Sequence, residues 1–223
     1  MHQKFNSGVS VLLRGGAAGV LAFAMLFGLS GTGPASLTGT AVATAPTVIP
    51  QGFLLTEAEA RAPQSDESLY EEGWAVSDGI GQPLQVSPCD KVDFGIGWER
   101  TSMRTITHFN SAPGFSSEQL VLHRTVGAAQ RALKLLRADL RQCSESKYSV
   151  KALRAGDEAI WVQGPQWGGR RDTVSIYAAI VRRGKAVMIY ALDEGNYQPG
   201  LGLLTKPAKK MAAKVCGIRG ICD

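Results

Sequence analysis

Four cysteines are the residues of this sequence whose types and spacing could do chemistry. They are Cys89, Cys143, Cys216 and Cys222, and the last two stand near the end of the chain with "GIRGI" between them. A zinc site usually pairs cysteines two to four residues apart or adds nearby histidines. A redox pair usually has the C-x-x-C spacing. Neither pattern is present, so the sequence favours disulfides.

Four cysteines allow three pairings, and their spacing alone does not choose among them. We favour Cys216–Cys222, which closes a small glycine-containing loop at the C-terminus, together with Cys89–Cys143. An even number of cysteines forming disulfides is typical of exported proteins. The prediction of disulfides therefore depends on whether the protein is exported.

The first residues have the layout of a secretory signal peptide. Lys4 and Arg14 are basic, residues 15–29 form an uncharged and mostly apolar run, and Ala41-Val42-Ala43 resembles a cleavage site. We therefore predict a signal peptide over 1–43 and a secreted, extracellular protein. The alternative is an N-terminal membrane anchor with the domain facing outside; membrane contact is expected only in that case.

The remainder is predicted to be a flexible lead-in over 44–55 followed by a single domain over 56–223. The whole sequence has a formal net charge of +5 and a pI of about 9.1. This charge suggests mild attraction to anionic surfaces. No dense stripe of lysine and arginine interleaved with aromatics is present, so no nucleic-acid partner is predicted.

Two histidines follow the predicted signal peptide, His108 and His123, each in a segment with strand character. The sequence contains no G-x-S-x-G elbow, no H-E-x-x-H, no phosphate-binding loop and no dinucleotide-binding glycine motif. We therefore predict no enzymatic activity, no cofactor and no metal. A hydrolase that uses one histidine with a serine and a carboxylate is the least favoured alternative.

Asp157 and Glu158 are adjacent acids at the start of a predicted strand. Neighbouring side chains of a strand point to opposite faces, so the two carboxylates are not expected to work as an acid/base pair. We predict instead that Gly156 and Asp157 form a turn.

The segment "WVQGPQWGGRRD" is the best candidate for a contact with a ligand or partner. It contains Trp161, Trp167, Arg170 and Arg171, and tryptophan and arginine often anchor binding surfaces. The alternative is that Trp161 belongs to the core and Trp167 packs the loop against the domain.

The clearest hairpin spans residues 172–195, with a tight turn at Arg183-Gly184. This turn places Tyr177 opposite Tyr190 and makes both faces of the hairpin largely apolar. One face could then line a groove, so these tyrosines, together with His108 and His123, are further candidate contacts.

The other elements follow from hydrophobic periodicity. Strands are predicted near 103–109, 118–124 and 156–164, and short extended pieces precede them. Helices are predicted near 57–62, capped by Thr56, at 125–143, and at 204–216, capped by Thr205. This order predicts an α+β fold: an antiparallel sheet of about five to six strands with two main helices packed on it and two disulfides.

In sequence order, "SPC", "AAQRALKLLRADLRQC", "GDEA", "VRRGKAVMIYA" and "CGIRGIC" resemble the PknH-like extracellular sensor domains of actinobacteria. The resemblance covers roughly 52–222. It implies an α+β domain with two disulfides paired as favoured above, and a cleft that binds a ligand. No kinase domain accompanies it here, so signalling would need a partner.

We therefore expect an exported, non-catalytic ligand-binding or sensor-type domain at the cell envelope, with a small molecule or cell-wall fragment as ligand. The alternative is a protein-interaction module or inhibitor that binds an envelope protein.

Overall fold

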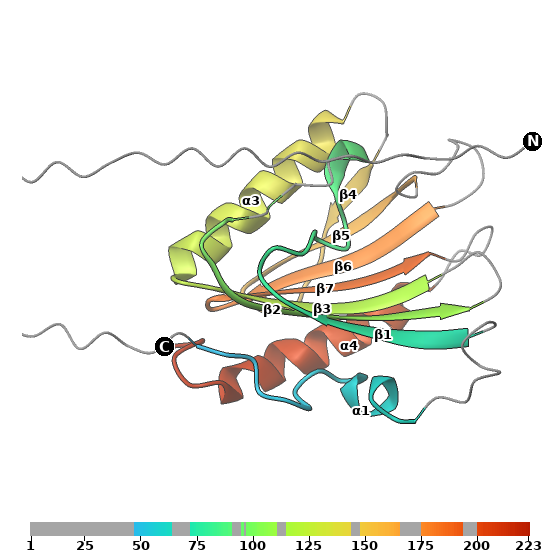
Figure 1. The fold of residues 1–223 in the computed structure, drawn as a ribbon. Coiled ribbons are helices and arrows are strands. Elements are labelled where there is room, and N and C mark those ends of the chain that lie inside the picture. Colours follow the sequence, from blue (N-terminus) through green and yellow to red (C-terminus); the bar gives the residue numbers. More distant parts are fainter. Residues whose placement is uncertain are drawn as a thin grey trace, which may run out of the picture. The chain divides into compact units, whose positions relative to one another are not determined.

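The computed structural model describes residues 47–63, 72–90, 95, 97–110, 115–143, 148–165, 175–193 and 200–223. These residues form an α+β domain, as predicted, in which one antiparallel sheet has helices on both faces (Figure 1). Among the described residues, no helix is long and apolar enough to cross a membrane.

The described strands form one seven-stranded sheet in the order β1-β2-β3-β7-β6-β5-β4, and every neighbouring pair is antiparallel. The prediction of five to six strands is therefore wrong. The sequence does not predict the short edge strand β4, because four residues are too few to show an alternating pattern. The strands are β1 (Glu72–Asp78), β2 (Arg100–Asn110), β3 (Phe115–His123), β4 (Ser149–Ala152), β5 (Glu158–Pro165), β6 (Ser175–Arg183) and β7 (Ala186–Asp193).

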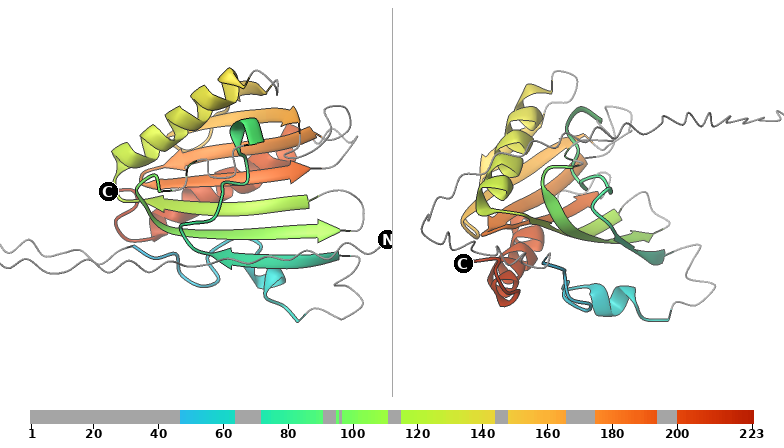
Figure 2. Two further views of the ribbon diagram at one scale, coloured as in Figure 1. Left: turned by 45° about the horizontal axis from the view of Figure 1, so that its top comes forward. Right: turned by 60° about the vertical axis from the view of Figure 1, so that its left-hand side comes forward.

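The two main helices lie on opposite faces of the sheet (Figure 2). Helix α3 (Val126–Gln142) packs an apolar stripe on one face. Helix α4 (Leu201–Lys214) covers the other, together with the short helix α1 (Glu57–Ala60). We call these the α3 face and the α4 face. The described 3-10 turns are η1 (Pro88–Asp90) and η2 (Val215–Gly217).

Strands β6 and β7 are buried on both faces, which explains their continuous apolar sequence. Their turn is Gly184-Lys185 rather than Arg183-Gly184, because Arg183 pairs with Ala186. Tyr190 therefore lies opposite Ala179 and not opposite Tyr177, although both tyrosines keep the same face. Gly184 has a φ of +54°, and a Cβ there would meet the carbonyl oxygen of Ile221 at 1.9 Å, so the C-terminal segment requires glycine.

Of the two helix caps predicted from threonines, Thr205 is wrong, whereas Thr56 has the predicted position but not the predicted side-chain bond. Helix α4 begins at Leu201 after Gly200, so Thr205 and Pro207 lie inside it. Thr56 precedes α1, but its side chain makes no capping hydrogen bond. Its hydroxyl instead donates to Glu118, a residue 62 positions away. A tertiary partner has replaced the local capping box.

Both favoured disulfides are confirmed, Cys89–Cys143 and Cys216–Cys222. The first ties η1 to the residue that ends α3. The second closes the C-terminal loop, whose Ile221 carbonyl accepts a hydrogen bond from Lys185 N–H at 2.9 Å. Each bond therefore fixes a short connecting segment next to the C-terminal end of a main helix.

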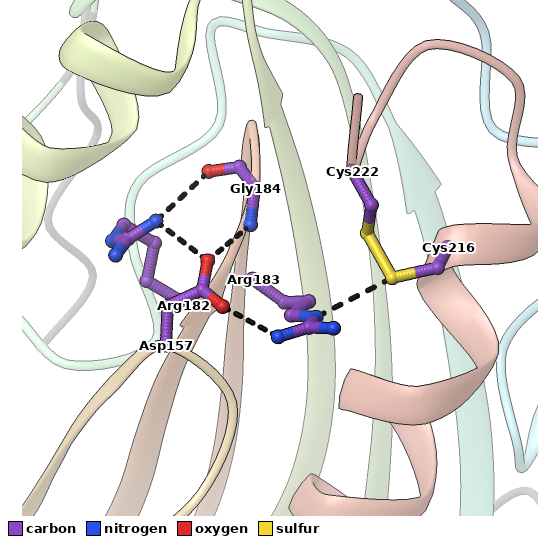
Figure 3. Close-up of a disulfide and its surroundings, with 6 residues drawn as sticks. All are labelled: Asp157, Arg182, Arg183, Gly184, Cys216 and Cys222. Carbon is purple, nitrogen blue, oxygen red and sulfur yellow. Dashed lines mark hydrogen bonds and ion pairs between the residues drawn. A yellow bond between two sulfur atoms is a disulfide. The ribbon is translucent and has the colours of Figure 1, made fainter.

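Asp157 forms part of a turn, as predicted, and it also holds the β6–β7 turn (Figure 3). Its Oδ2 accepts from Gly184 N–H at 2.8 Å and from Arg182 Nη1 at 2.9 Å, and its Oδ1 accepts from Arg183 Nη1 at 2.6 Å. Burial tends to raise the pKa of Asp157, but these donors outweigh it and lower the pKa. Arg183 also donates Nε–H to Cys216 Sγ at 3.4 Å, which links this corner to the disulfide.

Glu158 forms an ion pair with Arg137 of α3 at 2.9 Å and lies 3.8 Å from Arg182 Nε, so both adjacent acids contact Arg182. Asp157 precedes β5, so the strand pleat does not separate the two side chains, and each carboxylate is paired with arginine.

Candidate functional site: a cavity on the α4 face

A cavity of about 370 Å³ lies on the α4 face, between the sheet, α4 and the N-terminal segment that precedes α1. Its volume is within the range of small-molecule sites, roughly 300–1,000 Å³. Its lining is Leu55, Thr56, Trp74, Ile106, Ser116, Ser117, Glu118, Tyr190, Ala191, Leu192, Leu203, Leu204 and Pro207.

Apolar side chains from four elements make most of the wall. Trp74 comes from β1, Ile106 from β2 and Leu192 from β7, and strand alternation places all three on the α4 face. Leu203 and Leu204 come from the first turn of α4, where Leu204 is buried and Leu203 is 55% exposed. An apolar interior with an exposed leucine at its edge suits an apolar ligand.

Glu118 is a buried carboxylate in this apolar lining. Its Oε1 accepts from Leu55 N–H at 2.9 Å and from Tyr190 Oη–H at 2.5 Å. Its Oε2 accepts from the N–H and the hydroxyl of Thr56, each at 2.9 Å. A carboxylate has about four lone-pair sites, so all the acceptor capacity of Glu118 is used.

This saturation assigns Glu118 a structural role. It has no acceptor left for a ligand, and it holds Leu55 and Thr56 against the sheet. Burial raises the pKa of Tyr190, and the charge of Glu118 and the hydrogen bond to it raise it further, so the phenol stays protonated. Tyr190 therefore donates to Glu118 and does not act as a base.

The segment that walls the cavity is pinned by further buried charges; we call residues 49–57 the strap. Arg104 donates to the carbonyl oxygen of Pro50 at 2.8 Å and to Glu57 Oε1 at 3.1 Å. Glu57 is fully buried and also accepts from Leu54 N–H at 3.2 Å. Burial tends to raise the pKa of Glu57, but donors from the backbone of Gly52, from Arg61 and from Leu54, with the charge of Arg104, lower it.

Helix α4 also contacts the strap. Lys214 Nζ donates to the carbonyl oxygen of Phe53 and lies 4.7 Å from the centroid of its ring. Ile49 and Leu54 are buried in the core of this face. Residues 47–55, whose sequence reads as a flexible lead-in, therefore pack as part of the domain.

The structure brings some of the predicted contact residues to this face. Tyr190 lines the cavity, and His108 lies beside it on β2, with its ring 4.4 Å from that of Trp74. Trp161 and Tyr177 are also on the α4 face, but they are buried in the core with their rings 6.2 Å apart.

His123 points to the opposite, α3 face, where its Nδ1 is hydrogen-bonded to the carbonyl oxygen of Trp98 at 2.9 Å. The two histidines therefore share no site. Trp167, Arg170 and Arg171 lie outside the described residues. In the part of the chain that the structure describes, no group of three or more histidine, cysteine or acidic residues could hold a metal ion.

Glu118, Trp74 and Arg104 were not predicted as site residues. The signal for Glu118 was its position in "EQLVLH", where it alternates with Leu120 and Leu122. An acid on an apolar strand face requires donors from elsewhere in the fold, and that requirement marks a tertiary contact.

A second cavity of about 310 Å³ lies on the α3 face. Leu84, Val86, Thr107, Phe115 and Ile176 are among its lining residues. The segment that covers it is held by Gln119, which accepts from Gln85 N–H and donates to the carbonyl oxygen of Pro83. Thr107 pairs with Ser117, next to the pair His108–Ser116 on the other face, so both cavities lie at the same end of the sheet.

No protein-family model and no curated protein sequence matches the chain. One similar solved structure is the crystal structure of the extracellular domain of PknH from Mycobacterium tuberculosis. The identity is 12%, the TM-score is 0.48, and the match covers 74% of this chain and 92% of that chain. This is a distant structural likeness. The family predicted from the sequence motifs stays a prediction.

Proposed function

We propose that this protein is an exported domain that binds a small, mainly apolar molecule in the α4-face cavity. The observation that carries the proposal is the preformed cavity of about 370 Å³. Its walls are fixed before any ligand arrives, because Glu118 and Arg104 hold the strap in place. A preformed site loses little conformational entropy when it binds, which favours affinity.

The lining suits binding better than catalysis. Glu118 uses all its acceptors, and Tyr190 holds its proton, so neither is free to exchange a proton with a ligand. The hydroxyl of Ser116 and the phenolic oxygen of Tyr190 can add a few polar contacts that orient a ligand.

Export is part of the same proposal. Its support is the pair of disulfides in the structure and the signal-peptide pattern over 1–43. Native mass spectrometry of protein from a culture supernatant reads the processed N-terminus, the two bridges and any bound mass in one spectrum.

The binding site can be tested by filling each cavity in turn. N-phenylnaphthylamine, an apolar dye that fluoresces when it leaves water, serves as the probe. Ser116→Phe fills the α4-face cavity, and we expect it to abolish dye binding. Thr107→Phe fills the α3-face cavity at the same end of the sheet and is the matched control, expected to leave binding intact.

Loss of binding in Thr107→Phe alone would place the site on the other face and refute the assignment. No dye binding by the unmodified protein would refute the proposed function itself. Circular dichroism of both variants shows that each remains folded.

A further inference from the structure

The positive charge of α4 indicates which chemical class of ligand suits the α4-face cavity. This helix carries four lysines and no acid: Lys206, Lys209, Lys210 and Lys214. Helix residues three or four positions apart share a face. Lys206 and Lys210 therefore lie along the same flank as Leu203 and Pro207, which line the cavity.

These two lysines are exposed. Lys214, further along the same flank, is bonded to Phe53. Within the described residues, no carboxylate forms an ion pair with Lys206 or Lys210. Two buried acids of this face are already engaged, because Glu118 is saturated by its four donors and Glu57 by Arg61, Arg104 and Leu54.

The interior of the cavity has the opposite preference. Glu118 is a buried carboxylate whose four donors, from Leu55, Thr56 and Tyr190, are neutral, so its charge repels a second anion brought close to it. An acidic group would therefore stay at the lysines, and only an apolar group would enter between Trp74, Ile106 and Leu192. The site has a cationic edge and an apolar, anion-repelling interior.

We propose that the ligand is a single-chain amphiphile with an acidic head group, bound with its chain in the cavity and its head at Lys206 and Lys210. The proposal rests on the proposed function and deepens it. Charge complementarity at the edge and exclusion of anions from the interior both favour one orientation. A free fatty acid and a single-chain anionic lipid drawn from a membrane share this chemistry.

Dodecanoate and dodecanol are the matched probes, since they differ only at the head. We measure the dissociation constant of each by displacement of N-phenylnaphthylamine, below the concentration at which either aggregates. We expect the unmodified protein to bind dodecanoate about fivefold more tightly, because an exposed ion pair adds up to about that factor. The preference should shrink as salt is added.

The double variant Lys206→Gln/Lys210→Gln should bind both probes equally, with an unchanged dissociation constant for dodecanol. Lys134→Gln, which removes one exposed charge from α3 on the other face, should keep the preference. Equal affinities for the two probes in the unmodified protein would overturn the proposal, and so would a preference for dodecanoate that survives in the double variant. In either case, binding of dodecanol would still support the proposed function. Failure of both probes to displace a dye that Ser116→Phe excludes would overturn this proposal and leave the proposed function standing, whereas no dye binding at all would overturn both.

Vesicles of phosphatidylcholine that contain lysophosphatidylglycerol, a single-chain anionic lipid, distinguish the two sources. Sedimentation with vesicles that is abolished by Ser116→Phe supports a lipid taken from the bilayer. Binding of dodecanoate without sedimentation supports a free fatty acid. Sedimentation that survives Ser116→Phe and depends on Lys206 and Lys210 would mean that the lysines bind head groups without the cavity, and would overturn the proposal.

Discussion

Glu118→Gln tests how the strap is held and therefore how the cavity is formed. The carboxylate accepts four hydrogen bonds, from Leu55 N–H, from Tyr190 and twice from Thr56. An amide keeps one oxygen and turns the other acceptor into a donor. If the new amide donor faces Thr56, the hydroxyl of Thr56 can rotate and accept a hydrogen bond from it. The backbone N–H of Thr56 can only donate, so it is left without an acceptor.

The expected loss follows from these four bonds. An orphaned buried N–H costs about 1–3 kcal/mol, and each of the two bonds kept by the amide weakens by about 1 kcal/mol when its acceptor loses charge. A neutral amide is cheaper to bury than a carboxylate, which offsets part of this loss. We expect the free energy of unfolding to fall by about 2–3 kcal/mol.

Urea unfolding at neutral pH measures this change. Hydrogen exchange at the amides of Leu55 and Thr56 locates it, because both N–H groups bond to Glu118, and their exchange should accelerate more than that of the central strands. Glu59→Gln, an exposed acid on α1, is the control and should leave both measurements unchanged. Glu118→Gln with stability within about 0.5 kcal/mol of the unmodified protein and unaltered exchange would refute the anchoring role.

Two further predictions concern the α3 face. Burial lowers the pKa of His123 to about 4, and the charge of Arg100 adds to this against the opposing hydrogen bond to Trp98, whereas the unperturbed value is 6.5. As the pH falls, the unfolded chain therefore binds a proton at His123 before the folded protein does. The contribution of His123 to the free energy of unfolding is complete above pH 6.5, and about 3 kcal/mol of it should be lost between pH 6.5 and pH 4. His123→Asn keeps a donor for Trp98 and should flatten this dependence in pH-resolved urea unfolding; equal slopes in both proteins would contradict the burial effect. Cys89→Ser should lower the free energy of unfolding by about 2–5 kcal/mol, because the bond to Cys143 fixes η1 to the end of α3, and an unchanged urea midpoint would show that the bond has no such role.

Some features follow from the sequence because they depend on local periodicity. The apolar stripe of α3 and the alternation in β2 repeat every three to four or every two residues, so each element is visible without knowledge of its neighbours. The hairpin of β6 and β7 is similar, since a glycine between two apolar runs brings them together. The Cys216–Cys222 pair is local in the same sense. Cys89–Cys143 joins residues 54 positions apart and was favoured because Cys143 ends the predicted helix and Cys89 stands in a loop, the pairing that the resemblance also implies.

Other features came only from the tertiary structure. Thr56 reads as a helix cap, but its hydroxyl bonds to Glu118 across 62 positions of sequence. Residues 47–55 read as a lead-in because they are short and contain proline and glycine. They pack because Arg104 and Glu118 on distant strands offer partners for their backbone groups.

The positions of the two histidines show the same limit. His108 and His123 were assigned to adjacent strands, but their relative faces depend on a pairing register that the chain between them does not specify. The structure pairs His108 with Ser116 and His123 with Arg100, which places the histidines on opposite faces. The sequence by itself determined the elements and their apolar faces. Only the folded sheet decided which polar groups meet, because those meetings depend on strand order and register over long sequence separations.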